Sequence, residues 1–357
     1  MALFVFALLA SACSSGGWQE MPEPPIDGRG FAGSACSESG LIVWGGATVR
    51  EVDSSDPEIV MAEIFADGAI FDVARRDWRV LPSGPLTARW GAAATIDGNN
   101  LLVWGGAGSV ISSLDPTDFD YPTDGAILDL STMEWTYLPE GPLRSRFDGA
   151  AVSLSGPEVF IYGGQATPGT DTSTLNAAFL NVTSLQFSVA QSPPIDSVVF
   201  ADHERLLAID SAGVYEYATA LDQWTVTSIE VPVDMGDPIA VVPIEDGTKA
   251  VVVSTSGSWT YEKTPGFVRL EASPIIGSDV QLRSSSSGAT IWDPASRSAW
   301  VLRDGTWEPL PTPRRLGTRE GSSVCQTLST LIIWGGQEDR DTVHLTRSDG
   351  MTIQIER

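Results

Sequence analysis

The chain has 357 residues, of which 42% are hydrophobic and 19% are charged, and this composition excludes a disordered protein. Its 46 acidic and 21 basic residues give a formal net charge of −25. So much negative charge repels the phosphates of DNA and RNA, so we expect no nucleic-acid partner.

The first predicted element is a leader. Residues 1–12 (MALFVFALLASA) form an apolar run that is too short to span a membrane and has the length of the hydrophobic part of a signal peptide. Cys13 follows within ASACSSGG, which resembles the lipobox of bacterial lipoproteins, and residues 13–17 then form a short tether. The resemblance implies export, lipidation of Cys13 and a membrane-anchored, extracytoplasmic protein of the cell envelope. A plain cleaved signal peptide is the alternative.

Residues 18–357 carry a repeated pattern. An arginine and several small residues precede an apolar strand that ends in two glycines, and a further strand such as GAIFDVARRDW (68–78) follows. Its final aromatic opens a short strand closed by proline, as in WRVLP. One unit is therefore predicted to contain four short strands. The strand with the double glycine occurs as LIVWGG (41–46), LLVWGG (101–106), VFIYGG (159–164) and LIIWGG (331–336).

This pattern resembles the kelch repeat, whose four-stranded blades assemble into a β-propeller. Seven units over residues 18–357 give roughly 49 residues each, near the kelch period of about 50. We therefore expect an all-β, seven-bladed kelch-type propeller, or six blades if 272–312 forms none. The double glycine is absent from 188–312, although residues 205–229 still read as three strands of alternating pattern joined by turns. The aromatic markers of the last strand are Trp18, Trp78, Trp135, Phe187, Trp224, Phe267 and Trp307.

Ring closure is predicted to join the two ends of this segment. Trp18 begins WQEMPEPP, a fourth-strand signal without three strands before it, whereas 313–348 offers three strands. The N-terminal strand is therefore expected to complete the last blade, although MTIQIER (351–357) competes for that place. Closure makes neighbours of the first strands that carry Cys36 and Cys325. Because an exported protein meets oxidising conditions, the two cysteines can form a disulfide. A pair of buried thiols is the alternative.

The repeat arginines are the candidate ligand-binding residues. Up-and-down topology places them at the channel mouth that also carries the long loops after the double glycines, at about 47–67, 107–124 and 165–175. Guanidinium groups bind carboxylates through paired donors, so this mouth is the expected functional face for an anionic ligand. The alternative is that each arginine braces its blade. The four residues are Arg29, Arg89, Arg146 and Arg319.

Signals for catalysis and metal binding are weak. Only His203 and His344 are present, and no hydrolase, metalloprotease or phosphate-loop motif occurs. The acidic loop at 112–125 lacks the spacing of an EF-hand, so we interpret it as a solvated loop and predict no metal and no cofactor. Its carboxylates are Asp115, Asp118, Asp120 and Asp124.

The interpretation that follows is a binding or interaction module that recognises a protein or carbohydrate ligand through one channel mouth. Two alternatives remain open. One is a carbohydrate-active enzyme resembling the kelch sugar-acid mutarotases, and the other is a structural protein of the envelope.

Overall fold

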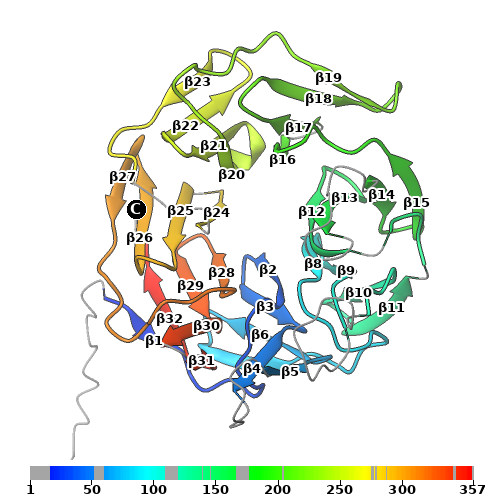
Figure 1. Ribbon diagram of the computed structural model, residues 1–357, viewed down its shortest axis with the longest axis vertical. Helices are drawn as coiled ribbons and strands as arrows, with labels where there is room; N and C mark the ends of the chain where they lie inside the picture. The colour runs from blue at the N-terminus through cyan, green and yellow to red at the C-terminus, as the bar shows by residue number, and fades with distance from the viewer. Residues whose placement is uncertain are drawn as a thin grey trace, which may run out of the picture.

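Seven four-stranded antiparallel sheets form a ring around a central axis, so the protein is an all-β, seven-bladed propeller (Figure 1). The predicted seven blades are confirmed, and the six-bladed alternative is wrong because residues 281–309 form a blade of their own. The described part of the chain contains no helix long and apolar enough to cross a bilayer. This computed structural model describes residues 17–51, 60–108, 120–138, 140–144, 146–165, 177–202, 205–274, 277, 280–286, 288–340 and 343–355.

Blades 1 to 3 contain the first three double glycines, which follow the second strand in blades 1 and 2 and lie within its last residues in blade 3. Blade 1 comprises β2 (Gly33–Ser37), β3 (Gly40–Trp44), β6 (Gly68–Asp72) and β7 (Asp77–Val80). Blade 2 comprises β8 (Ala93–Asp97), β9 (Asn100–Trp104), β10 (Gly125–Asp129) and β11 (Glu134–Leu138). Blade 3 comprises β12 (Phe147–Ser153), β13 (Glu158–Gln165), β14 (Ala177–Asn181) and β15 (Gln186–Ala190).

Blades 4 to 6 keep the same four-stranded order without the double glycine. Blade 4 comprises β16 (Val198–Asp202), β17 (Arg205–Ile209), β18 (Val214–Ala218) and β19 (Gln223–Val226). Blade 5 comprises β20 (Pro238–Ile244), the 3-10 turn η3 (Glu245–Gly247), β21 (Lys249–Ser254), β22 (Gly257–Glu262) and β23 (Gly266–Arg269). Blade 6 comprises β24 (Gln281–Ser285), β25 (Gly288–Asp293), β26 (Ser298–Arg303) and β27 (Thr306–Pro309).

Blade 7 is built from both ends of the propeller segment. It comprises β28 (Ser323–Gln326), β29 (Thr330–Trp334), β32 (Gly350–Gln354) and the N-terminal β1 (Gln19–Glu20). β1 pairs with β32, so the N-terminal strand takes the fourth place, as predicted. The segment 351–357 does not compete with it, because β32 is the third strand of the blade.

Two hairpins leave the blades after their double glycines. β4 (Ala47–Glu51) pairs with β5 (Val60–Ile64) on blade 1, and β30 (Gln337–Arg340) pairs with β31 (Val343–Thr346) on blade 7. The two hairpins touch, and the Thr48 hydroxyl donates to the Thr346 hydroxyl at 2.9 Å. A stretch expected to be a loop, 47–67, therefore contains two strands.

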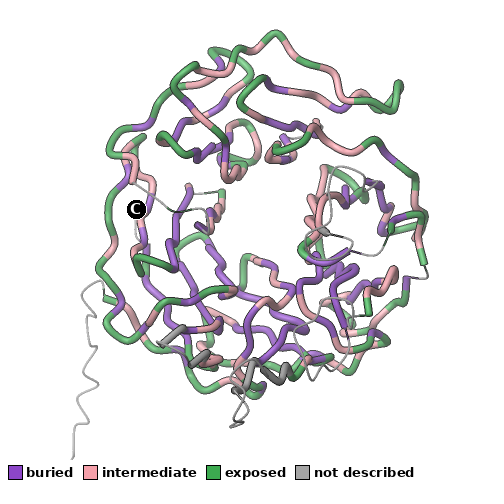
Figure 2. Tube along the Cα trace, viewed as in Figure 1, coloured by how far each residue is buried: buried purple, intermediate pink, exposed green. Residues whose placement is uncertain are grey.

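The hydrophobic core is divided into clusters that lie between neighbouring blades. Every residue of β3 is buried, and successive side chains of the strand point to opposite faces. Ile42 and Trp44 pack against blade 2, whereas Leu41 and Val43 pack against blade 7. This burial on both faces explains the continuous apolar runs before the double glycines. Exposed residues lie mainly along the outer rim and the turns (Figure 2).

Candidate functional site

The four repeat arginines lie just before the innermost strands of blades 1, 2, 3 and 7, as the repeat predicts, and all are at most 1% exposed. Each guanidinium donates from Nη1 to the carbonyl oxygen of the first glycine of its own blade's double glycine. Those contacts are Arg29 to Gly45 at 3.1 Å, Arg89 to Gly105 at 3.3 Å, Arg146 to Gly163 at 3.1 Å and Arg319 to Gly335 at 3.0 Å.

Three of these arginines also bind an aspartate, a pairing that the sequence analysis did not identify; one of the three, Asp124, was expected to belong to a solvated loop. The aspartate directly precedes the third strand in an Asp-Gly pair, a signal that recurs in DGAI, DGAI and DGMT. Because the second and third strands are paired neighbours, the fold returns this carboxylate to the arginine. The pairs are Arg29 with Asp67 at 2.6 Å, Arg89 with Asp124 at 2.7 Å and Arg319 with Asp349 at 2.9 Å.

In three of the four pairs, the second glycine connects neighbouring blades. Its backbone N–H donates to the carbonyl oxygen of the arginine in the next blade, so blades 7, 1, 2 and 3 are linked in series. A Cβ on the first glycine would also clash, since at Gly45 it would lie 2.5 Å from the Arg89 oxygen. The bonds are Gly336 to Arg29 at 2.9 Å, Gly46 to Arg89 at 2.9 Å and Gly106 to Arg146 at 2.8 Å.

Burial affects the charge of these groups without removing it. Desolvation lowers the pKa of Arg146 to about 10, and it lowers the pKa of Arg319 although Asp349 acts in the opposite direction. Both side chains stay protonated near neutral pH. Because the guanidinium groups are buried and bonded within their own blades, and three of the arginine backbone carbonyls accept from the preceding blade, we infer that these residues brace the ring; their binding of an anionic ligand stays a prediction.

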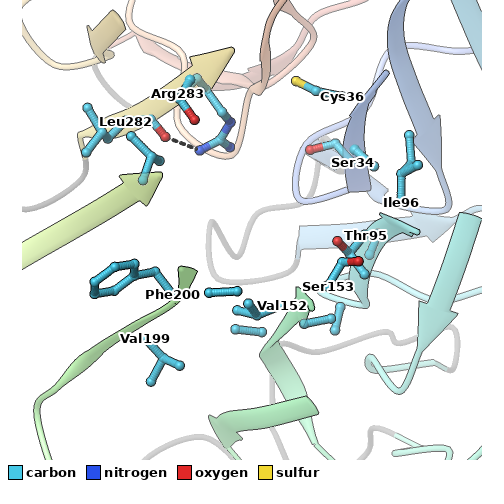
Figure 3. Close-up of a pocket in the computed structure, with 18 of the residues that line it drawn as sticks. Ser34, Cys36, Thr95, Ile96, Val152, Ser153, Val199, Phe200, Leu282 and Arg283 are labelled. Atoms are coloured by element: carbon cyan, nitrogen blue, oxygen red, sulfur yellow. Dashed lines mark hydrogen bonds between the residues drawn. The ribbon is translucent and has the colours of Figure 1, made fainter. Parts of the chain in front are cut away.

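A hollow of about 870 Å³ lies between blades 1 and 2, and the central channel is another. The channel encloses about 680 Å³ and is lined by residues of the innermost strands of all seven blades (Figure 3). Most lining side chains are alanine, glycine or valine, and several are hydroxyl-bearing. The labelled lining residues in Figure 3 are Ser34, Cys36, Thr95, Ile96, Val152, Ser153, Val199, Phe200, Leu282 and Arg283.

A smaller hollow of about 370 Å³ adjoins the channel and shares Ser153, Ala201, Pro243 and Ser284 with it. Its further lining residues come from the ends of first strands and from the turns that join first to second strands. Strand direction places these turns at the end of the ring opposite the double glycines. Five serines contribute to this wall: Ser153, Ser155, Ser284, Ser285 and Ser286.

Two of the three predicted cysteine sites are described by the structure, and one is not. A disulfide joins Cys36 on β2 to Cys325 on β28, with their Cα atoms 5.2 Å apart. This separation lies in the usual range for disulfides. Cys13 and the predicted leader, residues 1–12, lie outside the described residues.

The acidic loop and the histidines form no metal site among the residues that the structure describes. Asp124 is engaged by Arg89, whereas Asp115, Asp118 and His203 lie outside the described residues. Among the residues that the structure describes, no three His, Cys, Asp or Glu side chains converge as metal ligands would.

The propeller is similar to solved structures of other proteins. A fungal alcohol oxidase of the AA5 family, solved in complex with copper, matches with a TM-score of 0.66 and 14% identity, covering 95% of this chain and 76% of that one. YjhT matches with a TM-score of 0.51 and 13% identity, covering 94% of this chain and 99% of that one. At such identities the likeness shows the fold alone. No protein-family model and no curated protein matches the sequence.

Proposed function

We propose that the protein is an exported, lipid-anchored kelch-type propeller that acts as a binding module, with its ligand held at the central channel. The observation that carries this proposal is the channel itself, because about 680 Å³ is a volume typical of small-molecule sites. Small side chains on the inner strands keep this space open. Support for the double-glycine mouth as the entrance comes from the adjacent hairpins β4–β5 and β30–β31 at that end.

The test is binding of the purified full-length protein to a panel of acidic sugars and envelope polymers. We expect saturable binding without chemical conversion. Product formation would instead identify an enzyme of the sugar-acid mutarotase type, and neither binding nor conversion would favour a structural envelope protein.

Blocking the channel tests where the ligand binds. Ala150 on β12 lines the cavity, so Ala150→Trp should fill part of it and weaken binding by at least about tenfold. The matched control is Val226→Trp, since Val226 is 68% exposed on the outer strand β19. If both variants bind like the wild type, the ligand does not use the channel.

Export and anchoring depend on Cys13. Cys13→Ala should abolish acylation and leave the protein released or retained as an unprocessed precursor, because the lipid is attached to that sulfur. Metabolic labelling with a fatty acid and fractionation of cells measure both effects. An unchanged fraction and unchanged labelling would refute the lipid anchor.

A further inference from the structure

Arg283, on the innermost strand of blade 6, is the one charged side chain among the described residues that line the channel cavity (Figure 3). All other lining side chains are neutral, with hydroxyl groups on Ser34, Thr95, Ser153 and Ser284. The cation is unusual in a chain whose formal net charge is −25.

Three hydrogen bonds hold the guanidinium in place. Nε donates to the Val324 carbonyl oxygen at 2.8 Å, Nη1 to the Leu282 carbonyl oxygen at 2.9 Å and Nη2 to Gln281 Oε1 at 3.0 Å. Gln281 is itself fixed, because its Nε2 donates to the Ser322 carbonyl oxygen at 2.9 Å. The group is thus preorganised between blades 6 and 7 before any ligand arrives.

Among the residues that the structure describes, the charge of Arg283 has no carboxylate partner. A guanidinium has five N–H donors, so one N–H on each terminal nitrogen remains unused by acceptors in the described part of the chain. No described carboxylate lies within ion-pair distance, whereas Arg29, Arg89 and Arg319 each have one. Burial lowers the pKa of Arg283 to about 10, so the group is still protonated near neutral pH.

We propose that Arg283 anchors the carboxylate of a small monocarboxylic acid bound in the channel, an assignment that rests on the proposed binding function. The two unused N–H groups, one on each terminal nitrogen, can donate to carboxylate oxygens, and an anion offsets the desolvated positive charge. The neutral wall offers no second cation, which favours a ligand with a single negative charge. The surrounding alanine, valine and hydroxyl side chains would contact the uncharged body of the ligand.

The experiment titrates the full-length protein with acetate, lactate and benzoate, each compared with its neutral amide, by saturation-transfer NMR. We expect at least one carboxylate to bind saturably and its amide at least about tenfold more weakly. No carboxylate binding, or equal binding of acid and amide, would overturn the proposal. This comparison uses the wild-type protein and needs no variant.

Substitutions then locate the site. Arg283→Gln should abolish carboxylate binding and Arg283→Lys should keep part of it, while circular dichroism confirms the fold of each variant. The matched control is Arg303→Gln, which removes the same charge from blade 6 at an arginine paired with Glu308 on the neighbouring outer strand. Carboxylate binding that survives in a folded Arg283→Gln variant overturns the proposal.

These outcomes separate the two proposals. If a panel ligand binds in a way that Ala150→Trp blocks but Arg283→Gln leaves unchanged, the binding module stands and the role of Arg283 falls. If no panel ligand binds but carboxylates bind through Arg283, the anion site stands and the wider function needs another ligand.

Discussion

Buried arginines at the double-glycine end are stabilised by the acceptors around them, although Arg29 Nη2 and Arg319 Nε have no hydrogen-bond partner among the described residues. Removing such a charge from water costs several kcal/mol, and the cost is offset when an opposite charge and additional hydrogen bonds are in place. At Arg89 these are the Asp124 carboxylate at 2.7 Å, the Thr87 hydroxyl at 2.9 Å and the carbonyl oxygens of Thr87 and Gly105. The backbone carbonyl of Arg89 also accepts a hydrogen bond from the Gly46 N–H of blade 1.

Replacement of Arg89 by alanine should therefore destabilise the protein. We expect a loss of about 3–5 kcal/mol, because the change breaks a buried ion pair and leaves backbone carbonyls without donors. Chemical denaturation of Arg89→Ala measures the free energy of unfolding. The control is Arg79→Ala, an exposed arginine on β7, which should stay within about 0.5 kcal/mol of wild type. Equal stability of the two variants would contradict the bracing role.

The sequence located these arginines correctly but could not decide their role. The repeat pattern placed them before innermost strands, and that place was confirmed. Their Asp-Gly partners lie 30 to 38 residues away, so the ion pairs exist only once the second and third strands have paired. Arg283 was missed for a different reason. It lies in QLRSSSSG, which has no repeat signal, and only the ring shows that it faces the channel.

Aromatic markers tie each blade to its neighbour. In six blades the marker is the second residue of the fourth strand, as the pattern predicted, and its ring reaches the adjacent blade. Trp135 on β11 packs edge-on against Trp44 of blade 1, with ring centroids 6.3 Å apart. Its indole N–H donates to the Pro82 carbonyl oxygen at 2.9 Å, and Trp78 donates to Pro22 in the same way at 3.1 Å. The tryptophan and the proline of the repeat are thus partners across a blade boundary.

Trp135→Phe separates the hydrogen bond from the ring packing. Phenylalanine keeps a ring in the interface, as Phe187 does at the equivalent position of blade 3, but it cannot donate to Pro82. We expect a loss of about 1 kcal/mol in the free energy of unfolding. The neighbouring exposed change Thr136→Val is the control and should have a smaller effect. No loss in Trp135→Phe would mean that the hydrogen bond is not a stabilising contact.

At the level of strands, the repeat pattern predicted the strands of the blades better than the hairpins that leave the blades. The third strand of blade 7 was expected within 313–348, but it is β32, and 337–346 forms the hairpin β30–β31. Residues 343–346 and 350–354 both contain alternating apolar side chains, so periodicity cannot choose between them. The choice is made by pairing, since β32 joins β29 on one edge and β1 on the other.

Closure of the ring brings the sequence ends together in blade 7. β1 contributes only two paired residues, and Met21 adds a backbone bond to Gly350 at 2.9 Å. The indole N–H of Trp18 donates to the Pro311 carbonyl oxygen and so repeats the blade-to-blade contact of Trp135. A closed ring leaves no edge blade without a neighbour, which protects strand edges from pairing with other chains. Because β1 is so short, we expect closure to depend on further links between blades 7 and 1.

The disulfide between Cys36 and Cys325 is such a link. It joins the innermost strands of blades 1 and 7 across 289 residues of sequence, and a crosslink over so long a loop removes much of the entropy of the unfolded chain. We expect the double change Cys36→Ser and Cys325→Ser to lower the free energy of unfolding by about 3–5 kcal/mol, measured by chemical denaturation. Addition of a reductant provides the control, because it should destabilise the wild type toward the value of the variant and leave the variant unchanged. Wild type and variant of equal stability without reductant would show that β1 and the interblade core close the ring unaided.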